Sequence, residues 1–310
     1  MILDIDPKVD YAFKRVYGRE ENRDVLESIL EAVLAGTEFA TITDLKIVNP
    51  FNERETIDDK LSIVDVRARQ KSGELFNVEM QLLRFKAMQP RLLYYWSVSY
   101  ADQLDKGSSY VELKPSIMIC FADYDVFPGR TGWHSRFRVL DGEGRLFCPH
   151  LEIHVLELPK FELNSSTVVT PLEQWLFFLR EATNIDPEHR PPCLTLPTIH
   201  KAIEELNMIS LNEADHEIYR SRRKRWLDDQ SSRLDASAEA KAEGKAEGKS
   251  EGKAEGKAEG RAEGIIFGEI RLLESLLGQE PTPIGQLEAL PLDELVQMET
   301  ELKAKLANRS

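Results

Sequence analysis

The chain has 310 residues, of which 42% are hydrophobic and 30% are charged, and its formal net charge is −14. This length gives room for one domain of ordinary size with appendages, and the hydrophobic content excludes a disordered protein. The acidic charge argues against a protein that simply coats nucleic acid, because non-specific binding depends on neutralising phosphates.

The cysteines and the apolar segments indicate where in the cell the protein is expected. The three cysteines are far apart and include no Cys-x-x-Cys pair, so neither a disulfide framework nor a zinc site is indicated: Cys120, Cys148 and Cys193. No apolar stretch approaches the roughly 20 residues of a membrane helix, and the first residues lack the basic region and apolar core of a signal peptide. We therefore expect a cytoplasmic protein that does not contact membrane.

Two helices are predicted over residues 8–35, because apolar residues recur there at helical spacing and glycines stand at positions 18 and 36. Asp10 lies on the first helix and is either part of a functional site or a solvated acid near a helix start. A strand is predicted over 41–49. The acid-rich connection that follows ends in Asp59 and Lys60, which adjoin the next strand, and Lys60 is the better candidate for a phosphate contact.

Residues 61–69 and 75–82 are predicted to pair as a β-hairpin, since apolar side chains alternate with period two in both. The even-numbered positions would be the buried ones. Two even-numbered faces can pair only across a loop with an odd number of residues, and Lys71-Ser72-Gly73 fits, with glycine last in the left-handed conformation. That register makes Asp65 the direct partner of Glu79, with Cβ atoms roughly 4.5–5.5 Å apart. Two such carboxylates repel each other unless a cation lies between them.

The middle of the chain predicts further sheet and helix. Residues 87–106 have helical spacing, and 115–122 is almost wholly apolar, as expected of a strand covered on both faces. An outer strand is predicted over 153–158. Three histidines are interpreted as structural or surface residues rather than metal ligands, because no third ligand has a recognisable spacing: His134, His150 and His154.

The remaining sequence is mostly helical. Residues 171–226 predict a helical cover that ends in five cations within 220–225, which form either a solvated face or a DNA contact. Six tetrads of the form Lys/Arg-Ala/Ser-Glu-Gly follow at 241–264 and indicate either a flexible or marginally helical spacer or an oligomerisation stalk. Residues 265–309 regain helical periodicity. So small a module buries little alone, and we expect a homo-oligomer formed through this tail.

Several of these segments together resemble a known family. Asp65, followed about a dozen residues later by Glu79-Met80-Gln81, is similar to the Asp…Glu-x-Lys signature of the PD-(D/E)XK nuclease superfamily, with glutamine at the lysine position. Six ordered segments resemble more closely the Rpn family of recombination-promoting nucleases, also described as PD-(D/E)XK transposases. These segments are 10–18, 59–60, 64–68, 77–81, 91–95 and 157–161.

The resemblance implies an α/β fold with a restriction-endonuclease-like PD-(D/E)XK core, a mixed sheet flanked by helices in the order α-β-β-β-α-β, and a helical C-terminal extension. It also implies a DNA endonuclease that promotes recombination, in which Asp65 and Glu79 bind Mg²⁺, with Ca²⁺ or Mn²⁺ as alternatives, and Gln81 orients water. The accessory candidates are Asp10, Asp59 and Lys60, and the candidate DNA contacts are Arg67, Arg69 and Arg91.

Two other functions stay open. The missing lysine and the acidic charge also fit a degenerate nuclease fold that binds DNA or acts as an assembly module, and the tail fits an oligomeric scaffold. For the chain as a whole we expect four parts: a nuclease-like core over 1–165, a helical extension over 166–235, the tetrad spacer over 236–264 and a helical module over 265–310.

Overall fold

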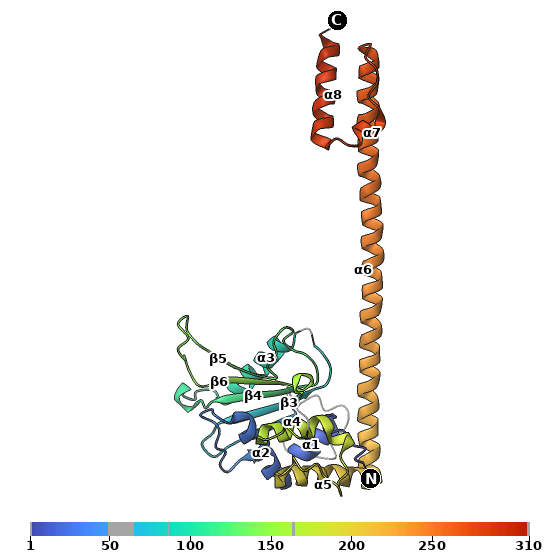
Figure 1. The fold of residues 1–310 in the computed structure, drawn as a ribbon. Coiled ribbons are helices and arrows are strands. Elements are labelled where there is room, and N and C mark those ends of the chain that lie inside the picture. Colours follow the sequence, from blue (N-terminus) through green and yellow to red (C-terminus); the bar gives the residue numbers. More distant parts are fainter. Residues whose placement is uncertain (1, 49–64, 86, 163–164, 309–310) are drawn as a thin grey trace. The chain divides into compact units, whose positions relative to one another are not determined.

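The computed structural model describes residues 2–48, 65–85, 87–162 and 165–308 (Figure 1). Contacts between residues divide the chain into two units, Met1–Gln230 and Ser231–Ser310. We describe each unit by itself. The four-part division expected from the sequence stays a prediction.

A six-stranded mixed sheet forms the centre of the first unit, in the order β1-β2-β3-β4-β6-β5. Strand β3 pairs in parallel with β4, and β4 with β6, whereas the other neighbours are antiparallel. The strands are β1 (Lys46–Ile47), β2 (Val66–Arg69), β3 (Leu75–Gln81), β4 (Ser116–Ala122), β5 (His134–Arg138) and β6 (Leu151–Glu157). This mixed sheet with flanking helices confirms the predicted α/β PD-(D/E)XK fold class.

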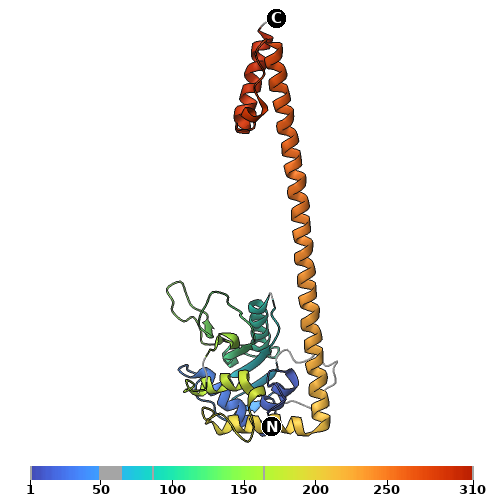
Figure 2. The same ribbon diagram turned by 45° about the vertical axis from the view of Figure 1, so that its right-hand side comes forward.

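Helices cover both faces of the sheet (Figures 1 and 2). On one face, α1 (Asp10–Tyr17), α2 (Arg23–Leu34), α4 (Pro171–Glu181) and α5 (Pro197–Leu211) share a hydrophobic core with Ile117 and Ile119 of β4. On the other face, α3 (Met88–Ala101) packs against Met118 and Cys120 of the same strand. Apolar residues at successive positions of β4 are therefore buried on both sides, as the sequence predicts.

The hairpin register agrees with the prediction. Val66 pairs with Val78 and Arg69 with Leu75, so the next pair in the same register is Asp65 with Glu79. The N–H of Gly73 donates to the carbonyl of Gln70 at 2.9 Å, and Gly73 has a φ of +108°. An added Cβ there would lie 2.7 Å from Cγ of Lys114, so glycine is required both by the turn and by its neighbour.

Three details of the sheet differ from the predictions. The odd-numbered positions of β3 are buried as well as the even ones, because α3 covers the face that was expected to be polar. The first strand has two residues, 46 and 47, rather than nine. Strand β6 is not the outer strand, because β5 pairs with its free edge, and β5 is too polar to show a strand pattern.

Polar contacts of α4 and α6 fix the helical cover to α1, α2 and the segment before α1. Thr170 and Glu173 form a capping box at the start of α4, and the buried Trp175 donates its indole N–H to Oγ of Ser28 at 3.3 Å. The first turns of the long helix α6 (Glu213–Leu276) are fixed in the same way. Asp215 accepts a hydrogen bond from Tyr11 at 2.7 Å, and the Tyr219 hydroxyl accepts the N–H of Asp6 at 2.9 Å.

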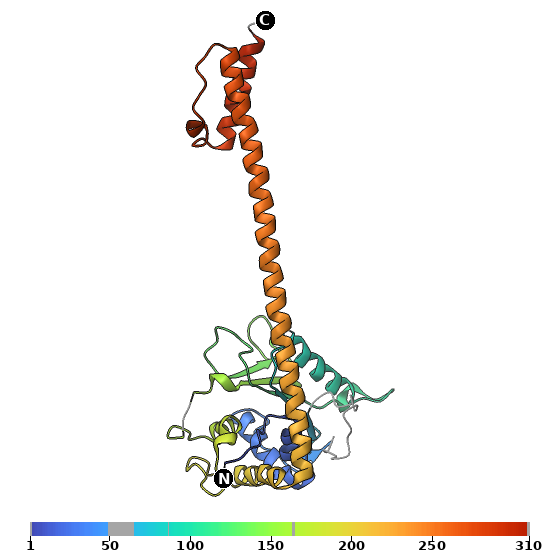
Figure 3. The same ribbon diagram turned by 90° about the vertical axis from the view of Figure 1, so that its right-hand side faces the viewer.

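In the second unit α6 continues through the tetrads at 241–264, and the glycines of these tetrads have nothing within 4 Å of an added Cβ. Helices α7 (Ile284–Leu287) and α8 (Leu292–Ala307) follow. The end of α6 and α8 lie side by side (Figure 3) and share an apolar core that includes Ile270, Leu273 and Leu295. Among the described residues, no helix is long and apolar enough to cross a membrane.

Candidate active site

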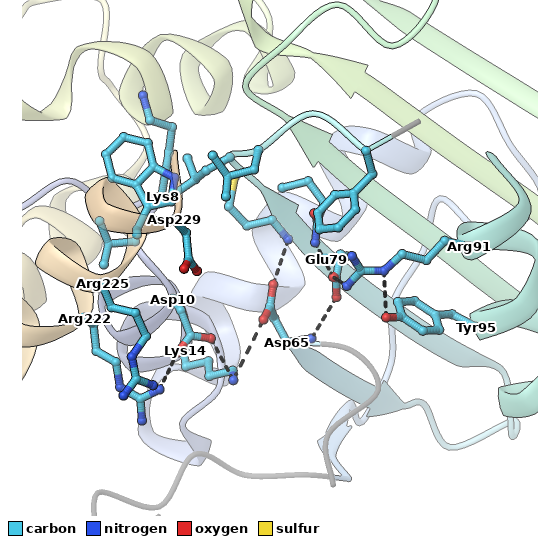
Figure 4. Close-up of a pocket in the computed structure, with 17 residues that line it drawn as sticks. Lys8, Asp10, Lys14, Asp65, Glu79, Arg91, Tyr95, Arg222, Arg225 and Asp229 are labelled. Atoms are coloured by element: carbon cyan, nitrogen blue, oxygen red, sulfur yellow. Dashed lines mark hydrogen bonds and ion pairs between the residues drawn. The ribbon is translucent and has the colours of Figure 1, made fainter. Parts of the chain in front are cut away.

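Asp65, Glu79 and Gln81 line a pocket of about 400 Å³ at the carboxyl end of β3 (Figure 4). The hairpin supplies these three residues, and helices α1, α3 and α6, together with the segment before α1, supply the other charged groups. Both cations and acids line the wall. The other charged residues there are Lys8, Asp10, Lys14, Arg91, Arg222, Arg225 and Asp229.

Each acid of the hairpin accepts a hydrogen bond from a backbone N–H of the opposite strand segment. The N–H of Met80 donates to Oδ2 of Asp65 at 2.8 Å, and the N–H of Asp65 lies 3.3 Å from Oε2 of Glu79. Burial and the charge of Glu79 raise the pKa of Asp65 well above its usual value. Burial raises the pKa of Glu79 to about 7, although Arg91 and Gln81 oppose the shift. The cations beside these two carboxylates therefore do not fully offset the cost of burying them.

Gln81 and Arg91 orient Glu79. Nε2 of Gln81 donates to Oε1 of Glu79 at 2.5 Å, and the Arg91 guanidinium lies 3.3 Å from the same oxygen. Arg91 is itself held by the Tyr95 hydroxyl, which accepts from Nε at 2.7 Å, and it stacks over the ring of Phe85. Arg91, proposed from the sequence as a DNA contact, thus lies in the site as a partner of a carboxylate.

Helix α1 brings Asp10 and Lys14 to the pocket. Nζ of Lys14 lies 2.8 Å from Oδ1 of Asp10 and 3.8 Å from Oδ1 of Asp65. Burial would lower the pKa of Lys14, but Asp10 and Asp65 outweigh it and the pKa is raised, so the ammonium stays charged. The sequence analysis singled out Asp10 and missed Lys14. Their separation of four residues, which places both on one face of a helix, was the available signal.

The start of α6 forms another part of the wall. Arg222, Arg225, Trp226 and Asp229 all line the pocket, and the Arg222 guanidinium lies 3.8 Å from Oδ2 of Asp10. The sequence showed the basic cluster at 220–225 but not which of its cations face the domain. That choice depends on the contacts that fix the rotation of α6.

Other predicted site residues do not reach this pocket. Arg67 extends towards α3 and donates to the carbonyl of Ser99 at 3.3 Å, and Arg69 lines a different hollow beside β1. Both lie on the same face of the strand as Asp65, but Arg67 is held against α3 and Arg69 is exposed. Asp59 and Lys60 lie outside the described residues.

A second polar cluster lies on β5 and β6, and we call Arg136, Glu152, His154 and His134 the histidine cluster. Glu152 and His154 are buried, His134 is partly buried and Arg136 is exposed. Nε2 of His154 lies 2.7 Å from Oε1 of Glu152, and its Nδ1 lies 2.8 Å from Nε2 of His134. Arg136 contacts both oxygens of Glu152, at 2.7 and 2.8 Å. Burial would raise the pKa of Glu152, but the hydrogen bonds from His154 and Arg136 outweigh it and the pKa is lowered.

The donor set at the hairpin suits a hard divalent cation. Asp65 and Glu79 offer carboxylate oxygens, and their raised pKa values indicate that Lys14 and Arg91 do not fully offset the cost of burying them. Within the described ranges, no group of three or more His, Cys, Asp or Glu side chains could hold a metal ion. Mg²⁺ does not need such a cage, because it commonly binds one or two carboxylates and keeps several waters. The residues present therefore fit Mg²⁺ better than a metal that requires full protein coordination.

Comparison with known families agrees with this geometry. The model of the PD-(D/E)XK nuclease family transposases matches residues 7–236, a range that includes Asp10, the hairpin and the start of α6. No curated protein and no solved structure matches the chain. The chain therefore belongs to the PD-(D/E)XK nuclease family transposases, and this membership supports a nuclease- or transposase-like function with DNA as the substrate.

Proposed function

We propose that the protein is a metal-dependent DNA endonuclease that hydrolyses phosphodiester bonds, with Asp65 and Glu79 as the ligands of Mg²⁺. One observation supports this above all: the buried Glu79 and the partly buried Asp65, which lie opposite each other on the hairpin, have raised pKa values in a pocket that is open to a substrate. Keeping two like charges close together is costly, and perturbed acids in a pocket are typical of functional sites.

The bound ion would polarise the scissile phosphate and make its water more acidic. The chain's own residues would do the rest. Gln81 is neutral, but its amide donates and accepts hydrogen bonds and can orient a water beside Glu79. Lys14 supplies, from α1, the positive charge that the superfamily motif carries at the position of Gln81. Asp10 holds Lys14 in place and acts as an accessory acid.

A cleavage assay tests the proposal directly. Supercoiled and linear DNA are incubated with the full chain in Mg²⁺, Mn²⁺, Ca²⁺ or chelator, beside the Asp65→Ala variant. A matched control is Asp105→Asn, which removes an exposed acid away from the pocket. We expect cleavage that needs a divalent cation, is lost in Asp65→Ala and is kept in the control. If no DNA is cleaved in any metal, the chain is instead a degenerate nuclease fold that binds DNA or assembles.

We propose further that the DNA breaks promote recombination, as the Rpn family resemblance suggests. In cells, expression of the wild-type chain should raise the recombination frequency between marked DNA segments. The Asp65→Ala variant at the same protein level should not. Equal frequencies for the two proteins would separate cleavage from any role in recombination.

We also propose that the chain self-associates through its tail. At the end of α6, Leu272 and Leu276 are 60% and 58% exposed, while their neighbours Leu273 and Leu277 fill the core shared with α8. The glycines of the tetrads also cost a lone helix roughly 1 kcal/mol each. A second copy would cover these leucines and stabilise the helix. Light scattering on the full chain should give a multiple of the monomer mass, and Leu272→Glu/Leu276→Glu should lower it; a monomeric wild-type chain would contradict the proposal.

A further inference from the structure

The first turns of α6 present one stripe of side chains to the domain. Asp215, Tyr219, Arg222, Trp226 and Asp229 follow one another at intervals of four and three residues, which keeps them on one face of a helix. Asp215 and Tyr219 are buried and hydrogen-bonded to Tyr11 and to the N–H of Asp6. These contacts fix the rotation of α6, so the last three residues of the stripe line the pocket.

This stripe has capacity to bind an anion. Arg222 is partly balanced by Asp10 at 3.8 Å, whereas no ion pair is found for Arg225 in the part of the chain that the structure describes. The indole N–H of Trp226 is buried and has no acceptor among the described residues. Two guanidiniums and a free N–H donor on one pocket wall suit phosphate oxygens.

We infer that Arg222, Arg225 and Trp226 bind the DNA backbone at phosphates adjacent to the one that is cleaved. The inference rests on the proposed function and adds the surface that holds the substrate. The chain as a whole carries a charge of −14, so a polyanion needs a local cationic wall to approach two buried acids. Arg222 and Arg225 provide that wall opposite Arg91, which Glu79 already engages.

The basic cluster contains its own matched control. Arg220 and Lys224 are exposed and do not line the pocket. At 100° per residue they lie on the side of α6 opposite to Arg222. Arg220→Gln/Lys224→Gln and Arg222→Gln/Arg225→Gln therefore remove the same charge from the same turns of one helix. Only the second pair faces the proposed DNA path.

The test is the salt dependence of DNA binding. Fluorescence anisotropy with a short labelled duplex, in chelator and in Ca²⁺, gives the slope of log K against log salt concentration. Each phosphate contact contributes about 0.9 to that slope. Arg222→Gln/Arg225→Gln should lose about two contacts in slope and about 10- to 100-fold in affinity at 100 mM salt. Arg220→Gln/Lys224→Gln should keep the slope, as should Trp226→Phe, which should bind more weakly because one neutral donor is lost.

The outcomes separate the two ideas. Equal losses in the two glutamine pairs would mean that total charge, not the stripe, governs binding, and would overturn the inference. Arg222→Lys/Arg225→Lys keeps the charge and should keep the slope, which guards against a glutamine variant that fails to fold. A wild-type chain that does not bind DNA would overturn both the inference and the proposed function. Stripe-dependent binding without cleavage would overturn only the proposed activity.

Discussion

The sheet carries two buried acidic clusters, and they differ in charge balance. On β6, Glu152 is 1% exposed and has Arg136 and His154 against its oxygens, and its pKa is lowered. At the end of β3, Glu79 is 3% exposed and also has a cation, Arg91, yet its pKa is raised to about 7. Two carboxylates with little exposed surface therefore give opposite results, because burial dominates at Glu79, whereas the hydrogen bonds from His154 and Arg136 outweigh burial at Glu152.

The comparison separates a structural cluster from a functional one. A buried carboxylate whose partners neutralise it needs nothing further from outside the chain. A buried pair whose neighbouring cations do not offset its burial either holds a proton or takes up a cation from outside the chain. The histidine cluster contains residue types that suggest catalysis, but its carboxylate, Glu152, is already paired with Arg136 and His154. Asp65 and Glu79 on the hairpin include no histidine, yet a bound cation would stabilise their charged forms.

The largest expected effect is on cleavage. Asp65→Asn should lower the cleavage rate by on the order of 10³-fold, because one of two charged metal ligands becomes a neutral amide. The asparagine oxygen can still accept the N–H of Met80, so the fold should be kept. Single-turnover cleavage and circular dichroism measure the two quantities. If this variant cleaves DNA at the wild-type rate, Asp65 takes no part in cleavage.

The histidine cluster should respond in the opposite way. Glu152→Gln leaves His154 and Arg136 facing a neutral amide and should lower the free energy of unfolding by about 2–3 kcal/mol. Any change in cleavage should follow the loss of folded protein. Glu143→Gln, which breaks an exposed ion pair with Arg145, is the matched control and should cost less than about 1 kcal/mol. Equal losses in the two variants, measured by urea denaturation, would show that Glu152 is not buried in a closed network.

Within the described residues, Lys14 is the ammonium that forms an ion pair with Asp65, so its removal sharpens the comparison. Lys14→Gln should lower kcat by about 10- to 100-fold, the usual range for a general acid–base or orienting group. Lys14→Arg should restore part of the rate because it keeps the charge. A purely structural role would instead lower the melting temperature in both variants and leave the rate per folded molecule unchanged.

Removing one acid should also stabilise the metal-free protein. The raised pKa of Glu79, about 7, means that the folded state holds protons that the unfolded state releases above about 4.5. This contribution to stability is lost as the pH rises through 7. At pH 8 without metal, Glu79→Gln should therefore raise the free energy of unfolding by on the order of 1–2 kcal/mol, and the gain should shrink at pH 5. A loss at pH 8 would contradict the raised pKa of Glu79.

The hairpin could be predicted from the sequence because residues close together in the chain determine its register. Alternating apolar residues in two runs and a glycine at the end of a three-residue loop specify the register, and the register pairs Asp65 with Glu79. The same logic failed for Arg67. Period-two alternation says which side chains share a face but not what covers that face, and α3 covers it here.

The rest of the site depends on contacts between segments far apart in the chain. Arg222 reaches the pocket because Tyr219 and Asp215, one and two turns earlier, dock on residues more than 200 positions away. The five cations of that cluster look alike in sequence, and nothing local distinguishes them. In the same way, the pairing of Glu152 with Arg136 requires β5, which has too little apolar alternation to be predicted as a strand.

The smallest expected effect is the change in the free energy of unfolding that the histidine cluster causes as the pH falls. Burial and the nearby His154 and Arg136 lower the pKa of His134 from 6.5 to about 4. Between these values the unfolded chain binds the proton and the folded chain does not, so this contribution to stability is lost as the pH falls from about 6.5 to 4. Wild-type protein should lose on the order of 1 kcal/mol more than His134→Gln between pH 7.5 and pH 5. Urea denaturation at the two pH values measures the difference. If the two proteins lose stability equally, His134 is not held neutral, and the histidine cluster is less closed than its hydrogen bonds suggest.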